Sequence, residues 1–310
     1  MKKSSAFLLA AVAATLATQA GAAITSYDLF ASNYHWQYGT TPTPAYAFTF
    51  YTRIVSSNPA DFTNASAVHT TGITPPMAMT DRGSEFSYTS PTYTTAAARN
   101  AAFPTGTYAF QVSGGTMGAL NAFRQYSSNN QFPLLPPAFT NIAGLRNVDI
   151  RNDLDIPLSN FSMPTGVTGH TFIAVFDGDE IVAEGDSTPN AGAFTLPGNL
   201  LLPNKQYTIS VYYTCRARTE AAGFSGASSD TGWDAITSTS LTTAHVCSSS
   251  DFNGDGDAGT DQDIEAFFAC IGGNCCPTCW VGGADFNSDG DAATDQDIEA
   301  FFRVLGGGNC

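Results

Sequence analysis

The chain has 310 residues and a formal net charge of −15 at pH 7, with 12 basic against 27 acidic side chains. This charge argues against nucleic acid or an anionic membrane as a partner, because both are themselves negative. Only 13% of the residues are charged, and Gly, Ser, Thr, Phe and Tyr are abundant. This composition predicts a mainly β, extracellular protein of two or three domains.

Residues 1–23 have the pattern of a secretory signal peptide. Two lysines after Met1 precede an apolar run, and small residues follow it up to Ala23, so we expect cleavage near Ala22 or Ala23. No later stretch has eighteen consecutive apolar residues. The sequence therefore predicts a secreted protein without a membrane span.

Residues 24–130 are predicted to form a β-rich N-terminal region. Alternating apolar residues at 46–55 and 107–112 indicate half-buried strands, and residues 94–102 indicate a brief helix. Trp36 and Tyr38 would share one strand face, where exposed rings could stack on a sugar. We prefer the interpretation that they pack in the core.

Residues 131–246 are predicted to form a β-sandwich. Two strand-like runs, 171–176 and 180–184, flank the hairpin turn Asp177-Gly178-Asp179. Further on, the run from Leu200 to Tyr213 resembles the turn and penultimate strand of a fibronectin type III domain. The resemblance implies a binding or spacer module in which the Tyr207 hydroxyl reaches the backbone near Leu202. The usual second-strand tryptophan is absent from the matching region, residues 156–161.

We find no arrangement of residues typical of an enzyme. No G-x-S-x-G elbow, P-loop or dinucleotide fingerprint occurs, and the four histidines lack the close spacing of a metal site. The histidines are His35, His69, His170 and His245. We therefore expect a protein without enzymatic activity, in which His170 is a structural residue.

An acidic segment near the end of the chain is repeated: residues 251–268 recur, with few changes, as residues 285–302. Both copies place oxygen-bearing side chains at positions 1, 3 and 5 and a glycine at position 6. Calcium takes about six to eight oxygen ligands, and glycine permits the sharp turn of a chain that surrounds the ion. The expected side-chain ligands are Asp251, Asn253 and Asp255 in the first loop and Asp285, Asn287 and Asp289 in the second.

Position 7 of a calcium loop donates its backbone carbonyl, which here belongs to Asp257 or Asp291. An EF-hand loop closes with Glu at position 12, but both copies have Gln there, with Asp on either side. We take Asp263 and Asp297 as the closing carboxylates of a loop one residue longer, because each directly precedes a helical pattern. Asp261 and Asp295 remain the alternative. The pattern predicts two bound calcium ions.

A helix follows each loop, because apolar residues recur at the spacing of one helix face. These residues are Ile264, Phe267, Phe268 and Ile271 in the first copy and Ile298, Phe301, Phe302 and Leu305 in the second. Thr260 and Thr294 can cap the helices, and glycines at 272 and 306 stop them.

No helix is predicted before either loop, and a pair of loop-helix units of this kind resembles the type I dockerin. More specifically, residues 251–310 are similar to divergent dockerin-like repeats of secreted bacterial proteins. The resemblance implies two calcium ions, folding coupled to metal, and docking onto a partner protein. The longer loop and the cysteines depart from the dockerins of cellulosomes, so a cohesin partner is not implied.

All seven cysteines lie from Cys215 onward, and in an exported protein they predict disulfides. Cys215 and Cys247 flank one predicted hairpin and are expected to pair across it. The tail cysteines are Cys270, Cys275, Cys276, Cys279 and Cys310. A redox C-x-x-C and a zinc site are alternatives for these, but structural disulfides are preferred, and one thiol of the seven is left over.

Taken together, these patterns predict β-sandwich domains followed by a small α-helical calcium-binding tandem. The preferred function is calcium-dependent attachment of a secreted protein to an extracellular or cell-surface protein. Two alternatives stay open: calcium that only stabilises a structural protein, and a carbohydrate-binding or carbohydrate-active region within residues 24–130.

Overall fold

The structure, a computed structural model, describes residues 24–308 except 73, 128–130, 189, 191, 221–223, 225 and 245. The expected signal peptide, His245 and Cys310 therefore lie outside the described residues. The strands are β1 (Ile24–Trp36), β2 (Ala47–Ser56), β3 (Asn64–His69), β4 (Met77–Ala78), β5 (Thr80–Asp81), β6 (Glu85–Thr89), β7 (Gly106–Ser113), β8 (Leu120–Tyr126), β9 (Leu154–Pro157), β10 (Thr168–Asp177), β11 (Glu180–Ser187), β12 (Ala193–Leu196), β13 (Gln206–Glu220) and β14 (Ser228–Thr242). The helices are α1 (Ala96–Ala102), the short 3-10 turn Ala143–Leu145, α2 (Asp261–Ile271) and α3 (Asp295–Leu305).

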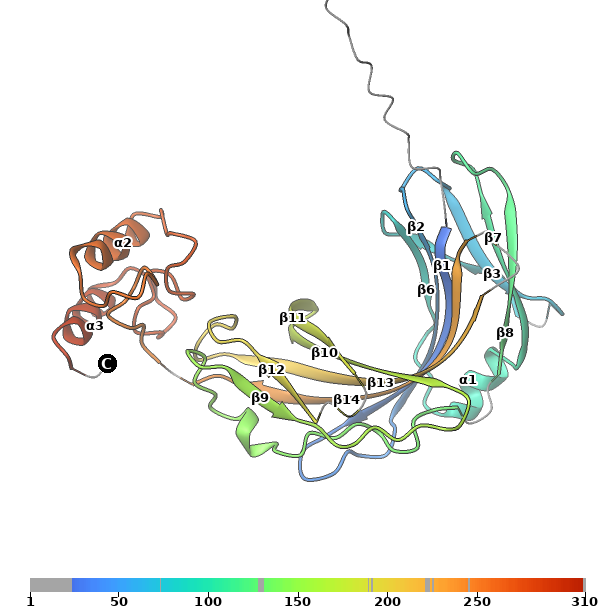
Figure 1. The fold of residues 1–310 in the computed structure, drawn as a ribbon, viewed down its shortest axis with the longest axis horizontal. Helices are drawn as coiled ribbons and strands as arrows, with labels where there is room; N and C mark the ends of the chain where they lie inside the picture. The colour runs from blue at the N-terminus through green and yellow to red at the C-terminus, as the bar shows by residue number, and fades with distance from the viewer. Residues whose placement is uncertain are drawn as a thin grey trace, which may run out of the picture.

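One large sheet organises the molecule (Figure 1). Its eight strands follow the order β11-β10-β13-β14-β1-β2-β6-β5. Neighbouring described strands in it are antiparallel, except that β1 pairs in parallel with β14. A four-stranded sheet, β4-β3-β7-β8, and the pair β12-β9 complete the β structure. The protein is thus mainly β with a small helical region at its C-terminal end, as the sequence predicts.

Both smaller sheets cover the same face of the large one. Along β13 the alternate residues from Tyr207 to Cys215 are buried, which is the period of a strand with one face in the core. On this face Tyr213 stacks on Phe161, close after β9, with ring centroids 4.5 Å apart. On the same face the Trp233 indole N–H donates to the carbonyl of Ser127, just past β8, at 2.9 Å. The layers therefore enclose one continuous core.

Residues 24–130 and 131–246, which were predicted as separate regions, contribute strands to the same large sheet. The first strand, β1, lies between β14 and β2, so strands from both ranges share one hydrogen-bonded ladder. The long strands β13 and β14, each of 15 residues, extend from the part next to β10 to the part next to β1 (Figure 1).

Several local predictions are confirmed. The turn at Gly178 joins β10 to β11, and α1 begins after the N-cap Thr95. The backbone N–H of Leu202 donates to the Tyr207 hydroxyl at 2.8 Å, the contact that the fibronectin resemblance implies. This bond fixes the turn before β13 against the start of the strand.

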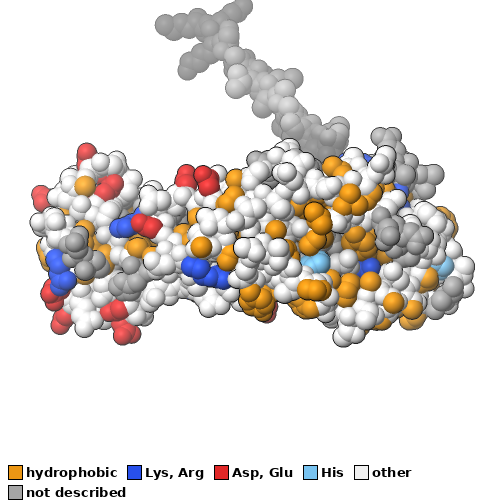
Figure 2. All heavy atoms as spheres, turned by 90° about the horizontal axis from the view of Figure 1, so that it is seen from below, with side chains coloured by type: hydrophobic (Ala, Val, Ile, Leu, Met, Phe, Trp, Pro, Cys, Tyr) orange, Lys and Arg blue, Asp and Glu red, His pale blue; other side chains and the backbone are white. Residues whose placement is uncertain are grey.

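The C-terminal module, defined here as residues 246–308, lies at one end of the elongated molecule, beyond the end of β14 (Figure 1). Acidic side chains gather at that end, whereas the sandwich shows few charges on the face seen in Figure 2. Residues 251–310 hold twelve acidic side chains and one basic one, Arg303. No helix among the described residues is long and apolar enough to cross a membrane.

Candidate metal loops in the C-terminal module

Two helices with matching caps form the base of the C-terminal module. Thr260 is the N-cap of α2 and Thr294 the N-cap of α3, and each forms a capping box with the Asp three residues later. Both helices end at a glycine, Gly272 or Gly306. The predicted starts and ends of the two helices are confirmed.

Four phenylalanines hold the two repeats together. Phe267 and Phe301 stack with ring centroids 4.2 Å apart, and Phe252 and Phe286, at position 2 of the two loops, pack edge-on against them. All four are at most 1% exposed. Each repeat thus contributes one loop residue and one helix residue to a core that neither could enclose alone.

Each loop is curled by hydrogen bonds between side chains and backbone, and the pattern repeats. The carboxylate of Asp251 accepts from the backbone N–H of Asp255 at 3.1 Å and of Gly256 at 3.0 Å. Thirty-four residues later, Asp285 accepts from Asp289 and Gly290, both at 3.0 Å.

The oxygens at positions 3 and 5 also accept backbone N–H groups two residues ahead. In the first loop these are the bonds from Asp255 to Asn253 and from Asp257 to Asp255, and in the second from Asp289 to Asn287 and from Asp291 to Asp289, each at 2.9 Å. The loops therefore point their oxygens inward, with glycine at position 6 in a left-handed conformation.

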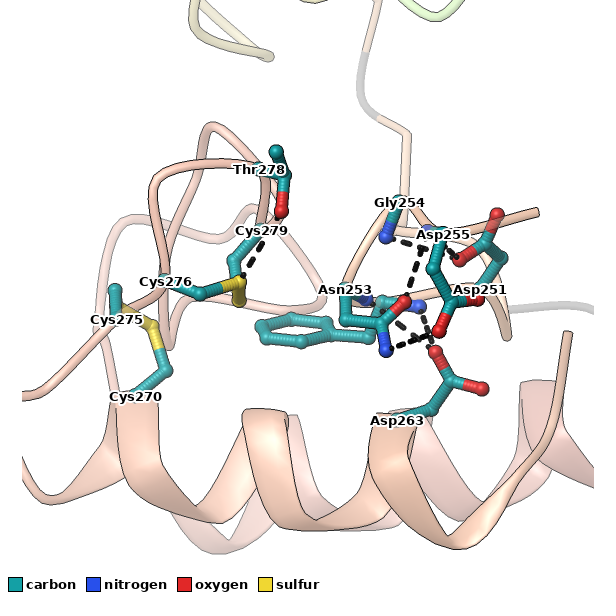
Figure 3. The surroundings of a disulfide bond; sticks show 11 residues. Asp251, Asn253, Gly254, Asp255, Asp263, Cys270, Cys275, Cys276, Thr278 and Cys279 are labelled. Carbon is teal, nitrogen blue, oxygen red and sulfur yellow. Dashed lines mark hydrogen bonds between the residues drawn. A yellow bond between two sulfur atoms is a disulfide. The ribbon is translucent and has the colours of Figure 1, made fainter. Parts of the chain in front are cut away.

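The residues at the closing positions differ sharply in exposure. Asp263 and Asp297 are fully buried, whereas Asp261 and Asp295, at the first position of each helix, are exposed. Asp257 and Asp291 are exposed as well. Figure 3 shows Asp263 directed from α2 toward Asn253 and Asp255 of the loop.

The carboxylate of Asp263 already has four protein donors. One oxygen accepts from the backbone of Phe252 at 2.8 Å and of Asn253 at 3.3 Å. The other accepts from the backbone of Thr260 at 2.8 Å and from its hydroxyl at 2.9 Å. Burial alone would raise the pKa of Asp263, but the bonds from Thr260, Asn253 and Phe252 outweigh it and hold the pKa below its usual value.

Side-chain contacts within the loops also involve positions 3 and 5. Across the described residues, no group of three or more His, Cys, Asp or Glu side chains is arranged to hold a metal. In both loops the Asn amide at position 3 donates to the carboxylate at position 5, at 2.8 Å. One oxygen of the carboxylate at position 5 is therefore already engaged by a hydrogen bond within the loop. Oxygens of the kind found at positions 1, 3 and 5 are the ligand type that calcium takes in proteins.

The disulfides correct one prediction and confirm another. Cys215 is a buried free thiol, so it does not pair with Cys247. Cys215 faces the core of the large sheet beside Trp233, whereas Cys247 lies past the end of β14 and is disulfide-bonded within the core of the module. The sequence pattern could not reveal which side of the strand Cys215 faces.

The module's own cysteines form structural disulfides. Cys270 pairs with Cys275 and Cys276 with Cys279, in the connection between the two repeats (Figure 3). These bonds use all four sulfurs that a zinc site would need.

The sequence analysis did not predict that one aromatic pair of the module would be exposed. Phe268 and Phe302 were assigned to the apolar helix stripes, but they are 44% and 46% exposed, with ring centroids 6.3 Å apart. The signal was present, since both occupy the same position of the repeat.

Trp36 and Tyr38 do not enter the core, contrary to the preferred interpretation. Tyr38 lies in the connection after β1 and is 74% exposed, and with Tyr46 both residues line a hollow of about 480 Å³.

Comparisons with known proteins show no relative at the level of sequence. No family model matches the chain, and no curated protein matches it. Similar solved structures include the BSP domain of a biofilm-associated protein, with 12% identity, a TM-score of 0.20 and 63% of this chain covered. The chain spans 27% of that protein's length.

Two further solved structures consist of fibronectin-type modules. Those of Clostridium thermocellum CbhA match with 10% identity and a TM-score of 0.23, covering 72% of this chain and 95% of theirs. The FN1–FN3 domains of chicken CNTN1 match with 11% identity and a TM-score of 0.21, covering 64% and 68%. At such scores these likenesses assign neither a family nor a function.

Proposed function

We propose that this is a secreted, non-enzymatic protein whose C-terminal module binds two calcium ions and attaches the β-sandwich body to an extracellular or cell-surface protein. The observation that carries the proposal is the repetition of the hydrogen bonds made by the carboxylate at position 1 of each loop. Asp251 and Asp285, at position 1 of the two loops, each bind the backbone N–H groups of positions 5 and 6. Calcium loops use oxygens at these positions, so the repetition supports one ion per loop.

In this proposal Asp263 and Asp297 close the loop through the protein rather than through the ion. Their carboxylates fasten the loop to the start of the helix, as the four donors to Asp263 illustrate. The exposed Asp261 and Asp295 are then the carboxylates available at the closing position of each loop. Backbone carbonyls of Asp257 and Asp291 complete the ligand set together with water.

The exposed pair Phe268 and Phe302 supports an attachment role. The two rings lie side by side on neighbouring helices and leave nearly half of each side chain in water. A sixty-residue module gains by burying such residues in its own core, so their exposure favours a partner that covers them. Two features support export: the signal-like start of the chain, and the disulfides, which persist in oxidising compartments.

Calorimetric titration of the oxidised chain, residues 24–310, with Ca²⁺ tests the metal proposal. We expect two binding events, one lost in Asp251→Ala and the other lost in Asp285→Ala. The matched control is Asp81→Ala, which removes an exposed carboxylate that also accepts a backbone N–H, from Gly83 at 2.8 Å. Absence of binding at millimolar Ca²⁺ would refute calcium binding, and an equal loss in the control would refute its assignment to the two loops.

Attachment is tested separately, with whole cells or extracellular matrix of the producing organism as the binding surface. Retention of the chain should require Ca²⁺, should fall at least tenfold in the double variant Phe268→Ser and Phe302→Ser, and should persist in Tyr46→Ser, a control with another exposed aromatic. Retention that is unaffected by the double variant would remove the docking role while leaving calcium binding intact.

A further inference from the structure

The face of the large sheet that the smaller sheets leave uncovered is hollowed into a pocket. Its volume is about 460 Å³, within the range of about 300–1,000 Å³ typical of small-molecule sites. Side chains from β1, β2, β10, β11, β13 and β14 line it. The pocket therefore exists only because strands from both halves of the chain share one sheet, and none of its lining residues belongs to the C-terminal module.

Two aromatic pairs form the walls of this pocket. Phe172 of β10 is paired with Tyr212 of β13, with ring centroids 5.4 Å apart. Phe30 of β1 is paired with Tyr51 of β2, with centroids 6.3 Å apart. Between these pairs runs β14, so flat apolar surfaces stand on two sides of a polar strip.

The polar strip carries an acceptor that is held in place by its neighbours. Asp234 of β14 lies opposite Thr214 on one side and Ser32 on the other. The Ser32 hydroxyl donates to the Asp234 carboxylate at 3.0 Å. Asp234 is thus oriented by the sheet itself, with its carboxylate among the residues that line the pocket.

Arg216 is a hydrogen-bond donor among the residues that line the pocket. Its Nη2 donates to His170 Nδ1 at 3.3 Å, and His170 Nε2 lies 2.8 Å from Asp186. The guanidinium carbon also stands 5.9 Å from the centre of the Phe30 ring. The Nε of Arg216, however, is buried and has no hydrogen-bond partner. The Arg216 side chain is among those that line the pocket, so its guanidinium group can donate to an acceptor on a ligand there.

The side-by-side donor and acceptor restrict the class of ligand. A carboxylate would satisfy Arg216 but would place a second carboxyl group beside Asp234, and an ammonium group would satisfy Asp234 but would lie near the positive Arg216. A hydroxyl group both donates and accepts, so neighbouring hydroxyls on one ligand satisfy both residues. The aromatic walls favour a ligand whose ring faces are apolar and can stack on them, while its polar groups lie at the ring edge.

We propose that this pocket binds a neutral saccharide of one or two pyranose rings, held between the pairs Phe172–Tyr212 and Phe30–Tyr51 and hydrogen-bonded by Arg216 and Asp234. This site is separate from the C-terminal module and does not depend on calcium. It also differs from the hollow beside Trp36, since it uses none of the residues of that hollow.

The test uses the full chain, residues 24–310, in EDTA, with saturation-transfer NMR and calorimetry against a panel of neutral mono- and disaccharides. Glucuronate and benzoate serve as anionic probes with and without a sugar ring. We expect at least one neutral sugar to bind, with its signal lost or its affinity lowered at least tenfold in Arg216→Gln and in Asp234→Asn. Asp234→Asn preserves side-chain size, whereas Arg216→Gln is shorter but stays polar, and far-UV circular dichroism and thermal melting verify that both variants fold.

Tyr212→Ala, which removes one wall, should also abolish binding, whereas Tyr46→Ala beside Trp36 should leave it unchanged. The proposal is overturned if no neutral sugar in the panel binds. It is equally overturned if both folded pocket variants bind like the parent, if Tyr46→Ala alone removes binding, or if benzoate binds as well as any sugar. None of these outcomes bears on calcium binding, because EDTA is present throughout.

Discussion

Phe267 and Phe301 stack ring on ring at 4.2 Å, joining α2 to α3 at equivalent positions of the two repeats. The next residue in each helix, Phe268 or Phe302, faces water instead. In each helix, a buried core phenylalanine is thus followed directly by a phenylalanine at the module surface.

This difference in burial predicts that two similar substitutions destabilise the module to very different extents. Phe301→Ala should destabilise the module by about 3–5 kcal/mol, because it removes a fully buried ring and leaves a cavity. Phe302→Ala is the matched control and should cost less than about 1 kcal/mol, since its side chain is 46% exposed. Helical circular dichroism during chemical unfolding measures both, and equal losses would contradict this assignment of core and surface.

Tyr207→Phe should weaken the sandwich without altering the fold. The change leaves the backbone N–H of Leu202 without its acceptor, at a cost of about 1–3 kcal/mol. Tyr46→Phe, at a residue that is 55% exposed, is the control and should be nearly neutral. The midpoint of denaturant unfolding, followed by tyrosine and tryptophan fluorescence, distinguishes the two. A neutral Tyr207→Phe would show that the corner bond contributes nothing.

Cys215 should be chemically silent in the native protein. Burial raises the pKa of its thiol to about 12, so almost no thiolate exists at pH 8, and the core excludes reagents. Iodoacetamide at pH 8 should therefore label no more than a trace before unfolding and one thiol afterwards. Cys215→Ser provides the blank. Rapid labelling under native conditions would place the thiol at an accessible surface.

His170 should titrate below its ordinary range. Burial, followed by the charge of Arg216, lowers the pKa of His170, and Asp186 opposes the shift. The pKa measured by NMR should therefore rise in Arg216→Gln and fall further in Asp186→Asn. Because the folded pKa lies below the unfolded value of about 6.5, stability from this group is lost as the pH falls below about 6.5. A native pKa above 6.5 would contradict the arrangement.

Local structure was largely predictable because short-range signals carry it. Thr260 and Thr294 begin their helices, and Gly178 turns β10 into β11, since caps and turns depend on neighbouring residues. The Leu202–Tyr207 contact spans only five residues.

Long-range placement was not predictable in the same way. The pairing of β1 with β14 joins residues about two hundred positions apart, as in the bond from the backbone of Asp230 to Asp28. Alternation indicates that a strand has two faces, but it does not say which face another sheet covers. For that reason the exposure of Tyr38, the isolation of Cys215 and the pocket around Arg216 emerged only from the assembled sheet.

The parallel pairing of β1 with β14 also sets an order for folding. A chain that is synthesised from its N-terminus presents β1 first, but one edge of β1 remains without its partner until residues 228–242 follow. Contacts between such distant segments form slowly, and an open strand edge can meanwhile pair with another chain. The large sheet can therefore close only after residues 228–242 have been synthesised, which makes the completion of this sheet a late event in folding.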